Sequence, residues 1–218
     1  STGHRKGLPG IYGGETDKQE GRAHVGGWIF NDSGTYEPHI WGWMRSRLNV
    51  SSILDVGCGL GISTDFFIRQ GMRPVCFEGS KEAIEGQRWS PYLAKAKPTI
   101  FQDFAVGPPN SRLRTRLTQN IKYFDAAWSA EFLEHIDEKY LSNVMAAFQQ
   151  AHLVAVTHGV PGQGGYHHVN LQTNEYWVKK FESYGFKYSK GLSLLAKSFA
   201  KHVTGTTEWQ YQRVCSYK

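Results

Sequence analysis

Segment 53–61 constrains the fold of this chain more than any other. Its residues, Ile-Leu-Asp-Val-Gly-Cys-Gly-Leu-Gly, form an apolar run that ends in an acid and continues with a glycine at every second position. A helical pattern begins directly afterwards, at Ile62. The segment predicts a strand, a tight turn and a helix N-terminus, because glycine permits sharp turns and close approach of the backbone to a ligand. The free amides of a helix N-terminus favour an anionic or polar ligand.

Predicted strands and helices alternate along the rest of the chain. We expect strands at residues 52–56, 74–78, 99–102, 124–128, 153–157, 186–188 and 209–216. We expect helices at residues 36–48, 62–70, 81–88, 130–150 and 173–184. Such alternation predicts an α/β fold, a mostly parallel sheet with helices on both faces, whose ligand binds at the carboxyl ends of the strands.

Residues 1–35 differ in composition from the alternating part. Residues 1–34 contain nine glycines and little periodicity, yet they include Tyr12, His24, Trp28 and Phe30, which is too aromatic for a disordered tail. We therefore expect an N-terminal arm, residues 1–35, that folds over the active site of one domain, residues 36–218. The start at Ser1 suits a domain cut from a larger multidomain polypeptide.

Composition narrows the setting of the protein. The three cysteines, Cys58, Cys76 and Cys215, are scattered and odd in number, which favours a reduced protein in the cytoplasm of the cell or host cell. No apolar run approaches the roughly 18 residues of a membrane span, and no signal peptide is visible. The net charge of +6 is concentrated in residues 179–218. A solvated basic face explains this better than a surface for nucleic acid, although the latter stays open.

Two acids follow the predicted second and third strands. Glu78 ends the second strand, where a carboxylate can accept both hydroxyls of a ribose. Asp103 ends the third and is followed by Phe104, so that an acid can accept from an adenine amine while an aromatic ring covers the base. Either acid alone would also serve as a helix cap. Together, in this order, they predict an adenosine pocket.

At this point the chain resembles the class I S-adenosylmethionine (SAM)-dependent methyltransferases. The resemblance covers about residues 50–190 and includes the glycine loop, the two acids and the segment 124–135, Phe-Asp-Ala-Ala-Trp-Ser-Ala-Glu-Phe-Leu-Glu-His. It implies a seven-stranded sheet with the last strand antiparallel, and SAM as cofactor. The residues it assigns to the cofactor are Asp55, Gly57, Gly59, Gly61, Glu78, Asp103, Phe104 and Trp128. A nicotinamide cofactor is disfavoured, because the loop reads G-x-G-x-G rather than G-x-G-x-x-G.

The pattern Glu131-x-x-Glu134-His135, followed later by His167-His168, suggests the substrate chemistry. On a helix, positions i, i+3 and i+4 share one face. The pattern is similar to the divalent-metal site of small-RNA 2′-O-methyltransferases and of catechol-type O-methyltransferases. That similarity implies Mg²⁺ or Mn²⁺ held by Glu131, Glu134, His135 and His168, with His167 as the alternative ligand. Glu131, His135 and His168 would then be the catalytic groups. Without a metal, His135, His158 or His168 is the expected general base.

The acceptor is expected to be a hydroxyl, one of a vicinal pair that a single ion can chelate. Expected substrate contacts are Trp28, Tyr36, Tyr166 and His167, since sugars stack on aromatic rings. A glycan hydroxyl ranks first, an RNA ribose 2′-hydroxyl second and a catechol or phenol third. A degenerate domain that only binds the donor or a partner is the non-enzymatic alternative.

Overall fold

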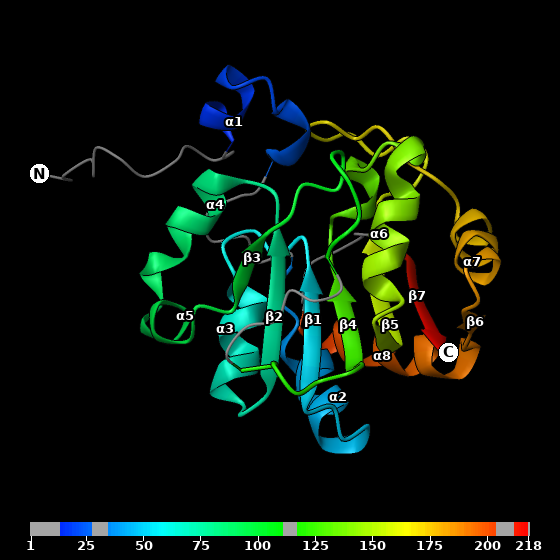
Figure 1. Cartoon of the computed structure of the whole chain (residues 1–218). Helices are drawn as coiled ribbons and strands as arrows, with labels where there is room; N and C mark the ends of the chain where they lie inside the picture. Colours follow the sequence, from blue (N-terminus) through cyan, green and yellow to red (C-terminus); the bar gives the residue numbers. More distant parts are fainter. Residues whose placement is uncertain (1–13, 28–34, 111–116, 204–211, 218) are drawn as a thin grey trace, which may run out of the picture.

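The computed structural model describes residues 14–27, 35–110, 117–203 and 212–217, with the side chains of 201–203 and 212–217 left out. Its strands are β1 (Ser52–Val56), β2 (Arg73–Glu78), β3 (Thr99–Phe101), β4 (Phe124–Ser129), β5 (Ala151–His158), β6 (Lys187–Tyr188) and β7 (Gln212–Tyr217). They form one sheet in the order β3-β2-β1-β4-β5-β7-β6 (Figure 1). The first five pair in parallel, whereas β7 is antiparallel to β5 and to the two-residue β6. The sheet thus has a five-stranded parallel part, which β7 and β6 extend at one edge.

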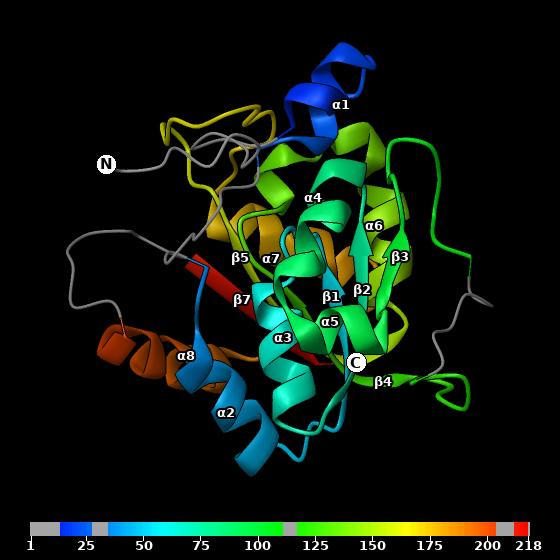
Figure 2. The ribbon, with the colours of Figure 1, turned by 90° about the vertical axis from the view of Figure 1, so that its left-hand side faces the viewer.

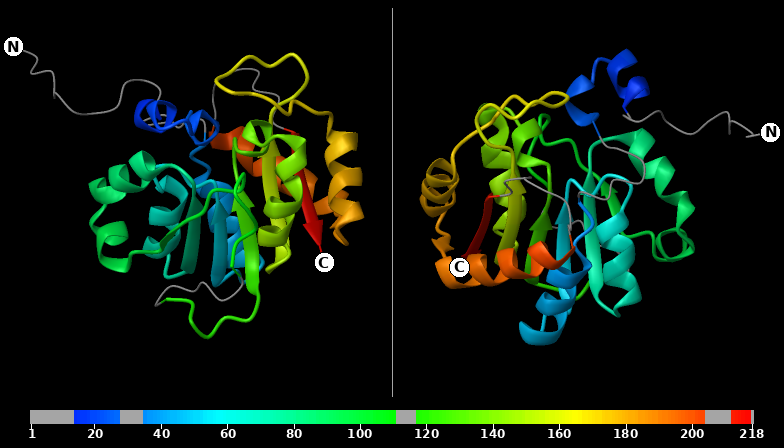
Figure 3. Two further views of the ribbon diagram at one scale, coloured as in Figure 1. Left: turned by 45° about the horizontal axis from the view of Figure 1, so that its top comes forward. Right: turned by 180° about the vertical axis from the view of Figure 1, so that it is seen from behind.

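Helices cover both faces of this sheet. They are α1 (Glu15–Gln19), α2 (Pro38–Arg47), α3 (Ile62–Arg69), α4 (Lys81–Gly86), α5 (Pro91–Ala96), α6 (Leu141–Phe148), α7 (Asn174–Ser183) and α8 (Lys190–Val203). One buried cluster joins the sheet to α6 and α7, and a second joins its other face to α2, α3 and α8. Figure 2 shows these two layers from the side, and Figure 3 shows them tilted with the top brought forward and from behind. The predicted α/β fold with a mostly parallel sheet and helices on both faces is confirmed.

The carboxyl ends of the parallel strands meet at one edge of the sheet, at the top of Figure 1. Strands β1, β2, β4 and β5 are almost fully buried, as in β1, where all five residues are buried, whereas β3 at the edge of the sheet is partly exposed. The short helix α1 and the turn Ala23–Val25 lie above this edge. The predicted arm thus has its described part, residues 14–27, over the region where ligands of such sheets bind.

The predicted helix over residues 130–150 is wrong in its first half. Residues 133–135 and 138–140 form two single 3-10 turns, and the α-helix begins only at Leu141. Glu131 has a left-handed backbone, with φ of 50°, which no α-helix tolerates. Glu131, Glu134 and His135 therefore do not share a helix face.

Three helices lie outside the predicted set. Pro91 lies beyond the predicted helix at 81–88 and is the first residue of α5, which Ser90 caps by accepting from two backbone amides. Helices α1 and α8 fall in segments that showed no clear pattern. Of the helices in the described ranges, none is long and apolar enough to cross a membrane.

The expectation that the cysteines are unpaired is also wrong in the structure. The sulfurs of Cys58 and Cys76 form a disulfide, with Cα atoms 5.9 Å apart. Cys58 lies in the glycine loop after β1 and Cys76 lies in β2, whose residues pair with those of β1. Strand pairing brings the two side chains together although they are 18 residues apart in sequence.

Candidate active site

A cavity of about 640 Å³ opens at the carboxyl ends of β1, β2 and β4. The residues predicted to hold the cofactor line it, with one exception, and they are Asp55, Gly57, Gly59, Glu78, Asp103, Phe104 and Trp128. Gly61 does not line it. The cavity wall also includes Glu131, His135, Tyr166, His167 and His168. The structure therefore gathers the two predicted parts of the site around one space.

The glycine loop needs its glycines for geometry. Gly57 has φ of 72°, and a Cβ there would lie 2.2 Å from the Phe132 ring. Gly61 also has a left-handed backbone and precedes α3. The carbonyls of the loop are held from the side, since Gln87 donates to Gly59 at 2.8 Å and Trp89 donates to Leu60 at 2.9 Å. These contacts hold the loop in one position at the floor of the cavity.

Glu78 is a buried carboxyl at the end of β2. Its Oε2 accepts from the Gly59 amide and its Oε1 from the Ser80 amide, both at 2.7 Å. Burial raises the pKa of Glu78 to about 7, against the opposing effect of these amides. This carboxyl therefore joins the glycine loop to the start of α4 and changes charge near neutral pH.

Asp55 is equally buried but is engaged within the fold. Its Oδ2 accepts from the hydroxyls of Ser63, at 2.6 Å, and Thr64, at 2.5 Å, both in the first turn of α3. Burial raises its pKa to about 6. Asp55 therefore fixes the start of α3 relative to β1 at the edge of the cavity.

Asp103, at the end of β3, meets a residue of the arm. His24 Nε2 lies 3.0 and 3.1 Å from its two carboxylate oxygens, and the Ala105 amide donates to Oδ1 at 2.9 Å. Phe104 is buried between Phe77 and Phe132, with ring centroids 6.3 and 5.8 Å away. The sequence predicts that His24 belongs to the arm, residues 1–35, that folds over the site. It does not predict the contact with Asp103, because no local pattern connects the two residues.

The second part of the site is the cluster Glu134, His135 and His168, whose ligand atoms lie within 4.8 Å of one another. Glu134 and His135 come from the 3-10 turn after β4, and His168 from the loop after β5. The Glu134 carbonyl accepts from the amides of Val169, at 2.9 Å, and Asn170, at 3.0 Å. These two bonds bring His168 to the turn, where its ring centroid is 4.9 Å from that of His135.

Glu131 lies beside Glu134 but is not one of the three clustered residues. Its amide donates to Thr157 Oγ1 at 2.8 Å, and the same hydroxyl donates to Glu131 Oε1 at 3.3 Å. The structure thus brings together three of the four predicted metal ligands and leaves Glu131 beside them at the cavity wall. Thr157, in β5, is a neighbour that the sequence pattern did not reveal.

Burial governs the charges of the cluster. It raises the pKa of Glu134 well above its usual range, and the nearby Glu131 carboxylate raises it further. It lowers the pKa of His135 to about 4, helped by His168 and His167, and lowers the pKa of His168 as well. His135 is therefore a neutral imidazole at pH 7, the form that binds metal or accepts a proton.

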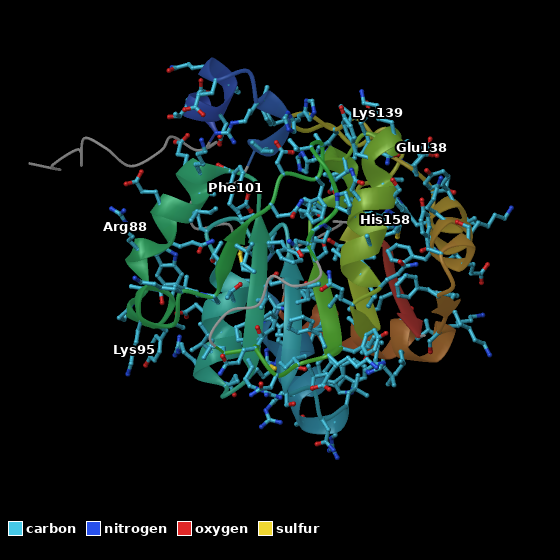
Figure 4. All side chains as sticks on the ribbon, viewed as in Figure 1. Arg88, Lys95, Phe101, Glu138, Lys139 and His158 are labelled. Carbon is cyan, nitrogen blue, oxygen red and sulfur yellow. A yellow bond between two sulfur atoms is a disulfide. The ribbon has the colours of Figure 1, made fainter. Side chains whose placement is uncertain are left out.

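The predicted substrate contacts divide into three groups. Tyr166 and His167 line the cavity. Tyr36 does not, and it packs edge-on against Trp41 at 5.6 Å. Trp28 lies outside the described residues. His158, an alternative base, is also absent from the cavity wall, because it is buried beside Trp177 and its Nδ1 contacts the Gly159 carbonyl at 3.0 Å. It is the last residue of β5, and Figure 4 labels it below Glu138 and Lys139.

Many solved structures share this fold. No family model and no curated protein matches the sequence. Among solved structures, magnesium protoporphyrin IX methyltransferase from Synechocystis, with bound SAM, is 15% identical over 94% of this chain and 92% of that chain, with a TM-score of 0.56. A TehB-like SAM-dependent methyltransferase from Corynebacterium glutamicum is 16% identical over 84% and 86%, with a TM-score of 0.54. The methyltransferase domain of a bacterial Hen1 protein is 17% identical over 82% and 95%, with a TM-score of 0.53. The chain therefore has the fold of the class I SAM-dependent methyltransferases.

Proposed function

We propose that this protein is a SAM-dependent O-methyltransferase that acts on a sugar or glycan hydroxyl, one of a vicinal pair. One observation carries the proposal. His135 and His168 line the same cavity as Glu78 and Asp103, so groups suited to activating a hydroxyl face groups suited to holding adenosine. A fold that merely retained the shape of a methyltransferase would have no reason to keep a Glu-His-His cluster around a buried carboxyl at this point.

The donor half of the cavity supplies recognition. Glu78 would accept from ribose hydroxyls, Asp103 from the adenine amine, and the glycine loop would let the amino-acid end approach the backbone. When bound, SAM supplies an electrophilic methyl group on a sulfonium that is its own leaving group. The role of these residues is to hold donor and acceptor in line, which alone accounts for much of the rate of such transfers.

The cluster fits a divalent ion such as Mg²⁺ or Mn²⁺. Both carboxylate oxygens of Glu134 and the Nδ1 atoms of His135 and His168 are buried without a hydrogen bond of ordinary geometry. Buried polar groups are rarely left so, and a mixed oxygen and nitrogen set is one that these ions accept. A bound ion would lower the pKa of an acceptor hydroxyl and orient two neighbouring hydroxyls. Without an ion, His135 or His168 would take the hydroxyl proton, since both are neutral.

The charge of the cavity favours a neutral acceptor over RNA. Among the described lining residues, five are acids and only Lys139 is a lysine or arginine. Lys139 is itself paired with Asp137 at 3.1 Å. A polyanion binds through clusters of unpaired cations, which this wall does not offer. The Tyr166 ring at the wall is a surface on which the C–H face of a sugar can stack.

The test is a screen with labelled SAM against oligosaccharides with terminal diols, an RNA oligomer and a catechol, with and without MnCl₂. We expect transfer to an oligosaccharide, stimulated by Mn²⁺. Transfer only to RNA, with a steep loss as salt rises, would replace the acceptor class. Transfer to none of the three by protein that binds the donor would overturn the proposed activity.

A variant separates the role of the cluster from that of the donor pocket. His168→Ala should lower turnover at least a hundredfold and leave the affinity for S-adenosylhomocysteine unchanged. His152→Ala is the matched control. His152 lies on β5, the strand that precedes the loop of His168, but its side chain is exposed and its ring lies near that of Tyr123. Turnover that is insensitive to EDTA and equal in both variants would remove the metal and the assigned role of His168.

A further inference from the structure

We propose that His24 is a specificity-determining residue of the donor pocket. It holds Asp103 as a hydrogen-bond acceptor, so that the pocket selects a purine with an exocyclic amine over one with a carbonyl at the same position. The inference rests on the proposed function, because it concerns the site that would hold the adenosine of SAM.

The contact between His24 and Asp103 is direct. His24 Nε2 lies 3.0 Å from Oδ2 and 3.1 Å from Oδ1, while the Ala105 amide donates to Oδ1 at 2.9 Å. An ionised carboxylate only accepts hydrogen bonds, so Nε2 carries the hydrogen in this contact. The carboxylate has about four lone-pair sites, and two donors leave acceptor capacity toward the cavity that Asp103 lines.

The arm places His24 through a buried ionic contact. Asp17, on α1, is 1% exposed; it accepts from the Ser80 hydroxyl at 2.5 Å and pairs with Arg22 at 2.5 Å. Arg22 also donates to the Gly79 carbonyl at 3.2 Å. The arm is thus tied to the segment that directly follows Glu78, and the turn containing His24 cannot drift from the cavity without breaking these contacts.

Packing holds the arm from the other side as well. Val25 lies so close to Gly79 that a Cβ on that glycine would be 2.9 Å from Val25 Cγ1. Tyr166 donates its hydroxyl hydrogen to the Ala23 carbonyl at 3.1 Å, and Lys18 Nζ lies 4.5 Å from the centre of its ring. His24, between Ala23 and Val25, is therefore fixed between the donor side and the acceptor-side loop.

Selectivity follows from the orientation of the carboxylate. With His24 and the Ala105 amide both donating, Asp103 offers the cavity only lone pairs. An amine satisfies them, whereas a carbonyl oxygen faces a second acceptor, and leaving buried acceptors unpaired is a strong means of rejection. Without His24 the carboxylate can turn away from the cavity, so discrimination should fall.

The experiment compares S-adenosylhomocysteine with S-inosylhomocysteine, which carries a carbonyl in place of the amine. Dissociation constants are measured by calorimetry for the wild type and for His24→Ala, His24→Gln and Glu15→Ala. Gln keeps an N–H donor at a similar reach. Glu15, exposed on α1, is the control for changes in the arm that do not touch the cavity.

His24→Ala should weaken S-adenosylhomocysteine binding about tenfold and S-inosylhomocysteine binding less than threefold, the loss of one charge-assisted hydrogen bond. His24→Gln should keep most of the discrimination, and Glu15→Ala should match the wild type. Equal weakening of both ligands would make His24 a packing residue and overturn the inference. Failure of the wild type to bind S-adenosylhomocysteine would instead refute the proposed function.

Discussion

At the scale of single residues, the site is built from carboxyls held away from water. Glu78 accepts from the Gly59 and Ser80 amides, yet its pKa rises to about 7 because desolvation outweighs those bonds. At Glu134, burial and the neighbouring Glu131 carboxylate raise the pKa well above its usual range. The two acids therefore suit different ligands. Ribose hydroxyls can donate further hydrogen bonds to Glu78, whereas a cation can neutralise Glu134.

The raised pKa of Glu78 predicts how donor binding depends on pH. The ionised carboxylate is the form that accepts from ribose hydroxyls, and with a pKa of about 7 it is mostly ionised at pH 8 and mostly protonated at pH 6. We expect the dissociation constant of S-adenosylhomocysteine to be about tenfold higher at pH 6 than at pH 8. Calorimetry at both pH values measures it. Glu78→Gln, which cannot titrate, should bind weakly with little pH dependence; an unchanged slope in that variant would contradict this role.

At the scale of elements, one glycine in each of two loops at the cavity has no room for a side chain. In the loop after β5, Gly165 lies against the imidazole of His168, and a Cβ there would be 2.2 Å from Cε1. At Gly164 a Cβ would meet nothing within 4 Å. Neighbouring glycines of one loop thus offer a matched pair of variants.

Gly165→Ala should displace the His168 ring and lower Mn²⁺ affinity at least tenfold, because metal sites depend on the orientation of each ligand. Gly164→Ala should leave Mn²⁺ affinity unchanged, and both variants should bind S-adenosylhomocysteine as the wild type does. Titration with Mn²⁺ followed by calorimetry makes the comparison. Equal Mn²⁺ affinities in the two variants would refute the proposed role of His168 as a metal ligand.

The glycine loop after β1 allows a similar comparison. Gly57 and Gly71 both have φ of 72°, but only Gly57 has a close neighbour, Phe132. Gly71→Ala should lower the free energy of unfolding by about 1–2 kcal/mol for its backbone alone. Gly57→Ala should add about 1–3 kcal/mol for overpacking and should also weaken donor binding. Urea unfolding and calorimetry test this, and equal losses with intact donor binding would show that the loop tolerates a side chain.

At the scale of the whole molecule, the parts that follow from sequence are those with a local cause. The strand and turn at 53–61 follow from apolar periodicity and glycine spacing, and Glu78 and Asp103 are found because parallel strands end at one edge. The turn at Leu133–His135 differs from the predicted helix, since i, i+3 and i+4 spacing does not reveal the left-handed backbone of Glu131. The cluster forms nonetheless, through backbone bonds from the Glu134 carbonyl to residues about 35 positions away.

Contacts of that range leave no pattern in a single sequence. The pairing of His24 with Asp103 spans 79 residues, and the disulfide depends on the register of β1 and β2. Helix α5 is missing from the predicted set for a different reason, because proline both ends helices and begins them, and only the Ser90 cap shows that Pro91 begins one. The sequence therefore predicts the position of the site better than the long-range contacts that hold its parts together.

The central claim is that the cavity at the strand ends holds the adenosine of a methyl donor. The measurement that tests it most directly is calorimetric titration of the folded wild-type chain with S-adenosylhomocysteine at pH 8. We expect saturable binding with one site per chain and a dissociation constant on the order of micromolar, a binding free energy of about −8 kcal/mol. Absence of binding by protein whose circular dichroism shows it to be folded would contradict the account.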